Sequence, residues 1–413
     1  MNAFLRADIL LPKLDDLSDW SVVACDQYTS EPAYWERVDA RTAGKPSAQH
    51  LILPEAQLSA PDVQERIAAI HETMDDYLRS GLFAAYSRCY FYVERSLNSG
   101  AVRRGVIGCV DLEQYDYLPG SQSAVRATEG TVLERIPPRV QVRRGAALEL
   151  PHILLLCDDA EDALLAPLAA KKDSFTILYD FELMEQGGRI RGWLVPKAEA
   201  DALDARIAAY TAAAPERYAD LHGTPFAFAV GDGNHSLATA KACYEALKAA
   251  HPGEDLSGHP ARYALAELEN LHDPALEFEP IHRVVTGVDE GDLLSALEAS
   301  CAADEGFPVV CVWGGEEKTI RLDPSKGELA VGILQRFLDD YLAAHPGSVD
   351  YIHGEDVTRR LAAAPDAVGF LLPAMEKRQL FRGVVAGGVL PRKTFSMGSA
   401  NEKRFYLEGR RIL

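Results

Sequence analysis

The amino-acid sequence predicts an α+β protein in which mixed or antiparallel sheets are flanked by helices. Segments of alternating hydrophobicity come in pairs joined by short polar turns, which is typical of β-hairpins. Amphipathic segments with helical spacing stand between these pairs in irregular order, whereas a doubly wound fold would alternate single strands with helices. The 413 residues, of which 47% are hydrophobic, suffice for two or three domains with packed cores.

The first part of the chain contains several of the predicted strand pairs. Residues 1–60 look irregular, and a helix is predicted over 61–80, where Gly81 ends it. Two antiparallel strands are expected over 89–97 and 103–115, around a turn at 98–100. The next expected elements are a buried strand over 152–159, a hairpin over 175–196, a helix over 198–213, and a strand followed by a helix over 225–250.

The second part of the chain continues the same mixture. Residues 260–275 suggest a loop or a short strand. The elements expected after it are helices over 289–300, 327–343 and 355–364, a hairpin over 307–323, and a strand over 367–374. No Pro/Ser/Gly-rich linker marks a boundary, so we expect two closely packed lobes, an N-terminal one over 1–255 and a C-terminal one over 256–413.

Charge and cysteine content restrict the function classes. A formal net charge of −20 argues against nucleic acid as a partner, because a phosphate polymer needs a basic surface. No apolar run is long enough to span a membrane, and the N-terminus has no signal-peptide pattern. The seven cysteines form no CxxC pair, which is typical of reduced thiols. We therefore expect a cytoplasmic protein with small-molecule ligands.

One short stretch, Gly231-Asp232-Gly233-Asn234-His235-Ser236, concentrates polar groups at a turn. It follows the apolar run at 225–230 and precedes a helical pattern, so Ser236 or Asn234 could cap that helix. Free amides and the macrodipole at a helix N-terminus attract anions. The stretch is neither a P-loop nor a Rossmann fingerprint. A turn stabilised by Asp232 and Ser236, with no ligand, is the structural alternative.

With other ordered motifs, this turn resembles the family catalogued as domain of unknown function 1015. That family carries an ADGHHR-type motif at a strand-to-helix turn. The further matching stretches are 24–35 (ACDQYTSEPAYW), 126–131 (RATEGT), 280–284 (PIHRV), 350–354 (DYIHG) and 391–395 (PRKTF), so the resemblance covers nearly the whole chain. It implies a partition-protein/sulfiredoxin-like core with large additions, similar to that of free-serine kinases.

The resemblance implies phosphate or nucleotide chemistry on a small hydroxy-amino acid such as serine. In the partition-protein/sulfiredoxin-like superfamily the phosphate is held at the helix N-terminus beside His and Arg. Here Asn234 stands at the first His position and Ser236 at the Arg position, which removes a bidentate phosphate fork. The cationic groups that could replace it are Arg126, Arg283, Arg392, Lys393 and Lys241.

We therefore predict a phosphoryl-transfer enzyme acting on a small phosphorylated or hydroxylated metabolite of the serine or phosphoserine kind. The direction, kinase or phosphatase, stays open. Asp232, His235, Asp26 and Glu129 are the candidate catalytic residues. The candidate residues for phosphate or substrate binding are Gly231, Gly233, Asn234, Ser236, Arg126, His282, Arg283, Arg392 and Lys393.

Asp232 and Asp26 are also the candidate ligands of Mg²⁺, and ATP or ADP is the candidate nucleotide. We expect the motif residues to meet in one cleft. A homodimer is compatible with the sequence.

Two other functions fit the same motifs. The chain could be a non-catalytic protein that binds a nucleotide or phosphometabolite. It could also be a redox enzyme that uses Cys25, although its apolar and acidic neighbours should raise the pKa of that thiol. The basic runs at 143–147 and 408–412 are expected to be solvated surface charge.

Overall fold

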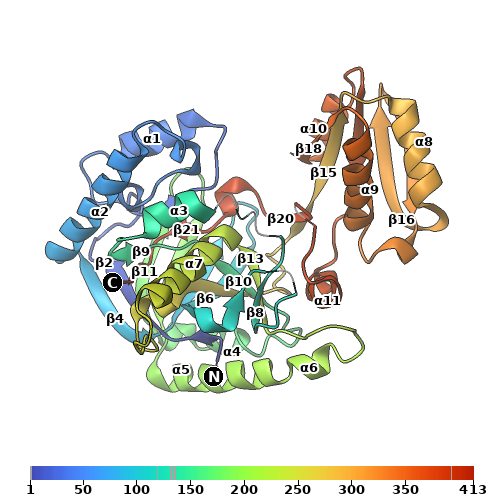
Figure 1. Ribbon diagram of the computed structural model, residues 1–413. Helices are drawn as coiled ribbons and strands as arrows, with labels where there is room; N and C mark the ends of the chain where they lie inside the picture. Colours follow the sequence, from blue (N-terminus) through green and yellow to red (C-terminus); the bar gives the residue numbers. More distant parts are fainter. Residues whose placement is uncertain (1, 119, 131–132, 134–135, 392) are drawn as a thin grey trace. The chain divides into compact units, whose positions relative to one another are not determined.

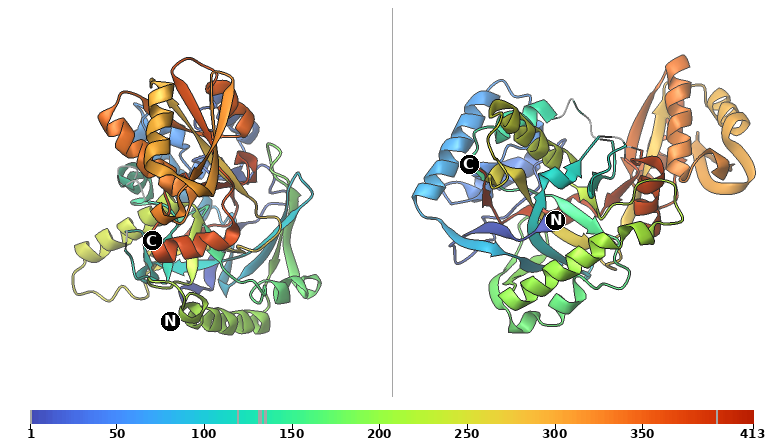
Figure 2. Two further views of the ribbon diagram at one scale, coloured as in Figure 1. Left: turned by 90° about the vertical axis from the view of Figure 1, so that its right-hand side faces the viewer. Right: turned by 60° about the horizontal axis from the view of Figure 1, so that its bottom comes forward.

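The computed structural model describes residues 2–118, 120–130, 133, 136–391 and 393–413. The chain forms two compact units. Unit 1 consists of Met1–Leu276 and Ser399–Leu413, and unit 2 consists of Glu277–Gly398. The C-terminal tail thus returns to the unit in which the chain began, and both chain ends belong to unit 1 (Figures 1 and 2).

Unit 1 is built on a mixed sheet of ten strands among the described residues, with β1 attached to β6 and the main order β11-β12-β5-β6-β14-β10-β13-β8-β7. Parallel pairing occurs between β10 and β14, between β13 and β8, and between β7 and β8. The strands of this sheet are β1 (Phe4–Leu5), β5 (Phe91–Ser96), β6 (Val102–Asp111), β7 (Tyr115–Asp116), β8 (Val125–Ala127), β10 (Leu154–Cys157), β11 (Thr176–Glu182), β12 (Arg189–Leu194), β13 (Phe228–Asp232) and β14 (Tyr263–Asn270).

Three small antiparallel pairs complete the strands of unit 1, and two of them involve the C-terminal tail. The pairs are β2 (Ala7–Pro12) with β4 (Phe83–Cys89), β3 (Val22–Val23) with β21 (Phe405–Tyr406), and β9 (Leu148–Glu149) with β22 (Arg410–Arg411). Backbone pairing therefore holds the tail through β21, through β22 and through an antiparallel bridge between Leu10 and Gly409.

Helices of unit 1 pack on both faces of the large sheet. They are α1 (Pro32–Thr42), α2 (Val63–Arg79), α3 (Ile136–Arg143), α4 (Ala166–Ala169), α5 (Lys197–Ala212), α6 (Ala214–Arg217) and α7 (Asn234–Ala250). The buried residues of α2, Ile67, Ile70 and Met74, recur at intervals of three and four, which places them on one face of the helix. Helices α3 and α7 lie side by side (Figure 1).

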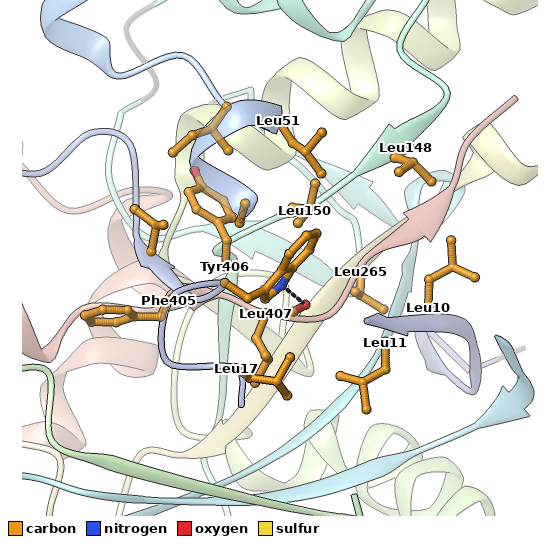
Figure 3. Close-up of a cluster of buried hydrophobic side chains, with 14 of the residues drawn as sticks. Leu10, Leu11, Leu17, Leu51, Leu148, Leu150, Leu265, Phe405, Tyr406 and Leu407 are labelled. Carbon is orange, nitrogen blue, oxygen red and sulfur yellow. Dashed lines mark hydrogen bonds between the residues drawn. The ribbon is translucent and has the colours of Figure 1, made fainter. Parts of the chain in front are cut away.

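Alternation along the central strands divides the core of unit 1 into two layers. Phe91 and Val93 of β5 belong to the buried cluster that includes residues of α1 and α2, whereas Tyr92 between them belongs to the cluster that includes residues of α5 and α7. The first layer also contains the tail, because Trp20 Nε1 donates a 2.9 Å hydrogen bond to the Leu407 carbonyl within it (Figure 3).

Unit 2 has an antiparallel sheet in the order β17-β16-β19-β15-β18, and β20 pairs with β15. Helices α8 and α9 pack against β16, while α10 packs against β15, β18 and β19. Its elements are β15 (Phe278–Thr286), α8 (Glu290–Cys301), β16 (Ala302–Trp313), β17 (Glu316–Leu322), α9 (Ala330–Ala344), β18 (Ser348–His353), α10 (Glu355–Leu361), β19 (Ala367–Leu371), α11 (Lys377–Gly387) and β20 (Phe395–Met397).

The structure confirms the α+β class and most of the predicted elements. The division into units differs from the expected boundary at 255/256, because β14 lies between β6 and β10 inside the large sheet and cannot separate from it. Residues 260–275 therefore form a central strand, and residues 1–60 are less irregular than expected, since they include β2 and α1. Helix α11 was not anticipated.

Candidate active site

The polar turn of the sequence joins β13 to α7. Gly233 occupies it with φ at +75°, and a Cβ there would lie 3.0 Å from the Cα of Ile153, so only glycine fits without strain. Gly233 is itself the N-cap of α7, and no side chain caps the helix. The expected cap by Ser236 or Asn234 is therefore wrong, because both lie inside the first helical turn. The first intrahelical bond is donated by Leu237 N–H to the Gly233 carbonyl.

His152 is held beside this turn by the pairing of β10 with β13. The two strands run antiparallel, with Leu154 opposite Asp232, so the residues before β10 lie next to the end of β13. The His152 side chain is only 5% exposed. Its Nε2 lies 3.4 Å from the Ser236 hydroxyl and 3.7 Å from Asp26 Oδ2. Its Nδ1 lies 2.8 Å from the Tyr406 hydroxyl.

The buried His152 and the partly exposed Asp26 form a charge pair. Burial alone would raise the pKa of Asp26, but the charges of His152 and Lys403 and a 2.9 Å bond from Gln27 outweigh it and hold that pKa well below its usual range. Burial lowers the pKa of His152, whereas the Asp26 and Asp232 carboxylates raise it by more, and the pKa ends above its ordinary value. The pair therefore favours an imidazolium beside a carboxylate.

The C-terminal tail supplies the second cation of this site. Lys403 Nζ lies 3.4 Å from Asp232 Oδ2, and the other oxygen of Asp232 accepts a 2.8 Å bond from Gly233 N–H. The buried Arg95 positions this part of the tail, because it donates to the carbonyls of Asn401 and Lys403 and lies over the Phe405 ring. Lys403 thus reaches the turn from a segment far away in the sequence.

The same tail also orders the segment that carries Asp26. Strand β21 pairs with β3, and Tyr406 lies opposite Val22. The Tyr406 hydroxyl then accepts a 3.2 Å bond from Cys25 N–H. Burial and the neighbouring Asp26 raise the pKa of the Cys25 thiol to about 12, so it stays protonated at neutral pH. This agrees with the expected effect of its neighbours and argues against Cys25 as a thiolate nucleophile.

The remaining predicted residues of unit 1 lie on elements that adjoin the turn. Arg126 is on β8, paired with β13; its Nε donates to the Ser123 carbonyl at 3.1 Å and its guanidinium lies over Phe226. Glu129 follows the same strand, and His235 lies in the first turn of α7. Lys241 donates to the Leu112 carbonyl, further along α7.

The other predicted residues belong to unit 2. His282 is buried and its Nδ1 accepts a 3.1 Å bond from Leu372 N–H. Arg283 is fully buried and donates to Gln335 and to the carbonyls of Ile281 and Lys393. His282 and Arg283 thus form hydrogen bonds with other residues of unit 2. The Lys393 residue is exposed, and Arg392 lies outside the described residues.

No group of three or more His, Cys, Asp or Glu side chains that could hold a metal ion occurs in the described part of the chain. Mg²⁺ usually takes only one or two carboxylates from a protein and completes its shell with water and phosphate oxygens. Asp26 and Asp232 are of that donor type, so the Mg²⁺ assignment stays a prediction.

Sequence reasoning missed His152, Lys403 and Tyr406. His152 lies just before a short buried strand, and the GDGNHS turn lies at the end of another. A polar group next to a buried strand was therefore the signal in the sequence that could have identified His152. Nothing local marks Lys403 or Tyr406, because their partners are distant in the sequence.

The family model described as Protein of unknown function (DUF1015) matches residues 8–346. Among the curated proteins, none matches this chain. Among the residues that the structure describes, no helix is long and apolar enough to cross a membrane.

Several solved structures show a weak likeness to the chain, with 10% identity. A mutant free serine kinase in complex with AMP has a TM-score of 0.40, covering 72% of this chain and 90% of that one. SbnI with a C-terminal truncation from Staphylococcus aureus has a TM-score of 0.37, covering 71% and 82%. A conserved hypothetical protein from Pyrococcus furiosus also has 0.37, covering 72% and 93%.

Proposed function

Since this chain belongs to the DUF1015 family, whose function is unknown, we propose from its own residues that it is a phosphoryl-transfer enzyme acting on a small hydroxylated or phosphorylated metabolite. The observation that carries the proposal is the position of His152 between Asp26 and Ser236, at the first turn of α7. This arrangement combines a proton-transfer group with an anion-binding helix end.

The proposed phosphate position is the N-terminus of α7. Amides of the first helical turn have no partner within the helix, and the macrodipole adds partial positive charge there. The cationic Lys403 and the imidazolium of His152 contribute full charges next to it. Together they would replace the arginine whose position Ser236 occupies, and they would neutralise charge on a transferring phosphoryl group.

The proposed proton carrier is His152. The imidazolium of His152 could give its proton to the leaving oxygen in hydrolysis or in the reverse direction, whereas only the neutral imidazole could take the proton of an acceptor hydroxyl. Asp26 would keep the imidazole charged and oriented, and Tyr406 would hold its other nitrogen. Asp26 and Asp232 would hold Mg²⁺, which supplies charge neutralisation for the phosphate oxygens when it is bound.

A second function, binding of a nucleotide or phosphometabolite without catalysis, also has an observation in its favour. Ser236 cannot provide the bidentate contact of an arginine, and Asp232 is already engaged by Lys403 and Gly233. A protein built in this way could hold a phosphate without transferring it.

Ligand binding and turnover separate the two functions. Thermal melting would be measured with ATP, ADP, phosphoserine, serine and inorganic phosphate, each with and without Mg²⁺. A ligand at 100 times its Kd should stabilise the fold by about 2.7 kcal/mol. Phosphorus NMR would then follow transfer or hydrolysis of every ligand that binds. Binding with turnover supports the enzyme, binding without turnover supports the binding protein, and no binding of any phosphate compound contradicts both.

A further inference from the structure

A cavity of about 140 Å³ lies in unit 1 against the candidate site. The residues that line it include Cys25, His152, Ser236 and Tyr406, which are groups of the site itself. The cavity is thus continuous with the proposed position of the reacting hydroxyl or phosphate.

Apolar side chains from several separate elements form much of the remaining cavity wall. They include Leu51, Leu53, Met74, Val142, Leu148 and Leu150. Most of these side chains are firmly packed; Leu51 and Leu148 are 2% exposed and Met74 is 4% exposed. Figure 3 shows Leu51, Leu148 and Leu150 in the cluster that also holds Tyr406. A wall so packed indicates a preformed pocket.

Charged groups at the cavity neutralise one another. Arg139 pairs with Glu55 at 2.6 Å, and Arg143 pairs with Glu149 at 2.6 Å. Glu149 is also bonded by Arg410 at 2.8 Å. Within the residues that the structure describes, the arginine and glutamate side chains that line the cavity are thus engaged in ion pairs. The part of a ligand that fits this region is therefore a hydrocarbon group.

The volume sets the size of that group. A cavity of about 150 Å³ lined by Leu, Ile and Phe holds a benzene molecule. We propose, on the basis of the proposed function, that the substrate carries a compact apolar group of about four to six carbon atoms next to its hydroxyl or phosphate. The CH₂OH side chain of serine would leave most of the cavity empty and would forfeit the contacts of its wall.

A series of alkyl phosphates tests the inference. Affinities would be measured by calorimetry for inorganic phosphate and for methyl, ethyl, propyl, butyl, isopentyl and octyl phosphate. Each buried CH₂ should tighten binding by about fourfold. We expect the gain to continue to butyl or isopentyl phosphate and to stop or reverse for the octyl compound.

A variant that fills the cavity, compared with a matched control variant, tests the inference a second time. Val142 on α3 is half-buried and lines the cavity, whereas the neighbouring Gln141 is exposed and does not. Val142→Phe should remove the gain beyond ethyl phosphate and leave the affinity for inorganic phosphate within about twofold. Gln141→Phe should leave the whole series unchanged.

The outcomes separate this inference from the proposed function. Binding of inorganic phosphate with no dependence on chain length would overturn the inference and leave the proposed function standing. No binding of any phosphate, but graded binding of the neutral alcohols butanol and isopentanol that Val142→Phe removes, would overturn the proposed function and keep the apolar pocket. No binding of either series would overturn both.

Discussion

Two histidine–aspartate pairs lie at the two ends of strand β10, and they differ in surroundings more than in composition. His152 precedes the strand and lies 3.7 Å from Asp26. Asp158 follows the strand and lies 2.6 Å from Nε2 of His272. By distance alone the second pair would be the better candidate for proton transfer.

The environments reverse that ranking. His272 is 31% exposed, and Asp158 also accepts a 2.7 Å bond from the Tyr218 hydroxyl, so its oxygens hold two structural elements together. His152 is 5% exposed and faces a helix N-terminus, a hydroxyl and an apolar cavity. A short pair with a partly exposed histidine stabilises little, whereas a longer pair whose histidine is buried next to space for a ligand can do chemistry.

The largest expected difference between the two pairs is in turnover. His152→Gln should lower the rate of phosphoryl transfer by about 10²- to 10⁴-fold, because it removes the proton carrier and keeps a hydrogen-bonding side chain. His272→Gln should leave the rate within about twofold. Phosphorus NMR with the substrate identified in the ligand screen measures both. Equal losses in the two variants would show that neither histidine has a special role.

The next largest effect is expected in stability, where Gly233 of the turn between β13 and α7 approaches Ile153 just before β10. Gly233→Ala should lower the free energy of unfolding by about 2–3 kcal/mol, because it combines a positive φ with a Cβ 3.0 Å from Ile153 Cα. The control is Gly253→Ala after the other end of α7, where φ is +87° and the space is open. That change should cost about 1 kcal/mol. Urea denaturation of both variants would reveal the difference, and identical costs would mean that the close approach to Ile153 is unimportant.

The charge coupling between Asp26 and His152 predicts that the stability of the protein depends on pH. Asp26→Asn should lower the pKa of His152, since the carboxylate is the main group that raises it. The histidine contribution to stability is fully present below its unfolded pKa and is lost as pH rises through its raised folded pKa. The Asp26 contribution is present above its unfolded pKa and is lost as pH falls through its lowered folded pKa.

Wild type should therefore exceed Asp26→Asn in stability most clearly between about pH 4 and pH 6.5. Histidine NMR titration measures the pKa, and denaturation across pH measures the stability. A His152 pKa that does not move would contradict the assigned pair.

The smallest expected effect comes from the pair of His272 with Asp158. Asp158→Asn should cost about 1 kcal/mol or less in unfolding free energy, because the partly solvated pair with His272 is screened by water. It should leave turnover unchanged. A loss of activity in this variant would move the candidate site to the other end of β10.

Local sequence patterns predicted much of the fold because they depend on near neighbours. The helix over 61–80 and the hairpin over 175–196 were confirmed as α2 and as β11 with β12, since period and turn chemistry act within a few residues. The basic runs at 143–147 and 408–412 are solvated only in part, since Arg144 and Arg411 are exposed as expected whereas Arg143 and Arg410 are not. Arg143 and Arg410 both bond the buried Glu149, a contact that no local pattern indicates.

The sequence by itself determined the strand, the glycine turn and helix α7, because backbone geometry and helix periodicity are local properties. Only the tertiary structure decided which side chains meet there. His152 arrives through strand pairing, and Lys403 and Tyr406 arrive with a tail that returns to unit 1 after the whole of unit 2. Long-range pairing of this kind is stabilised by burial and by backbone hydrogen bonds between distant segments. The spacing of neighbouring residues does not indicate such interactions.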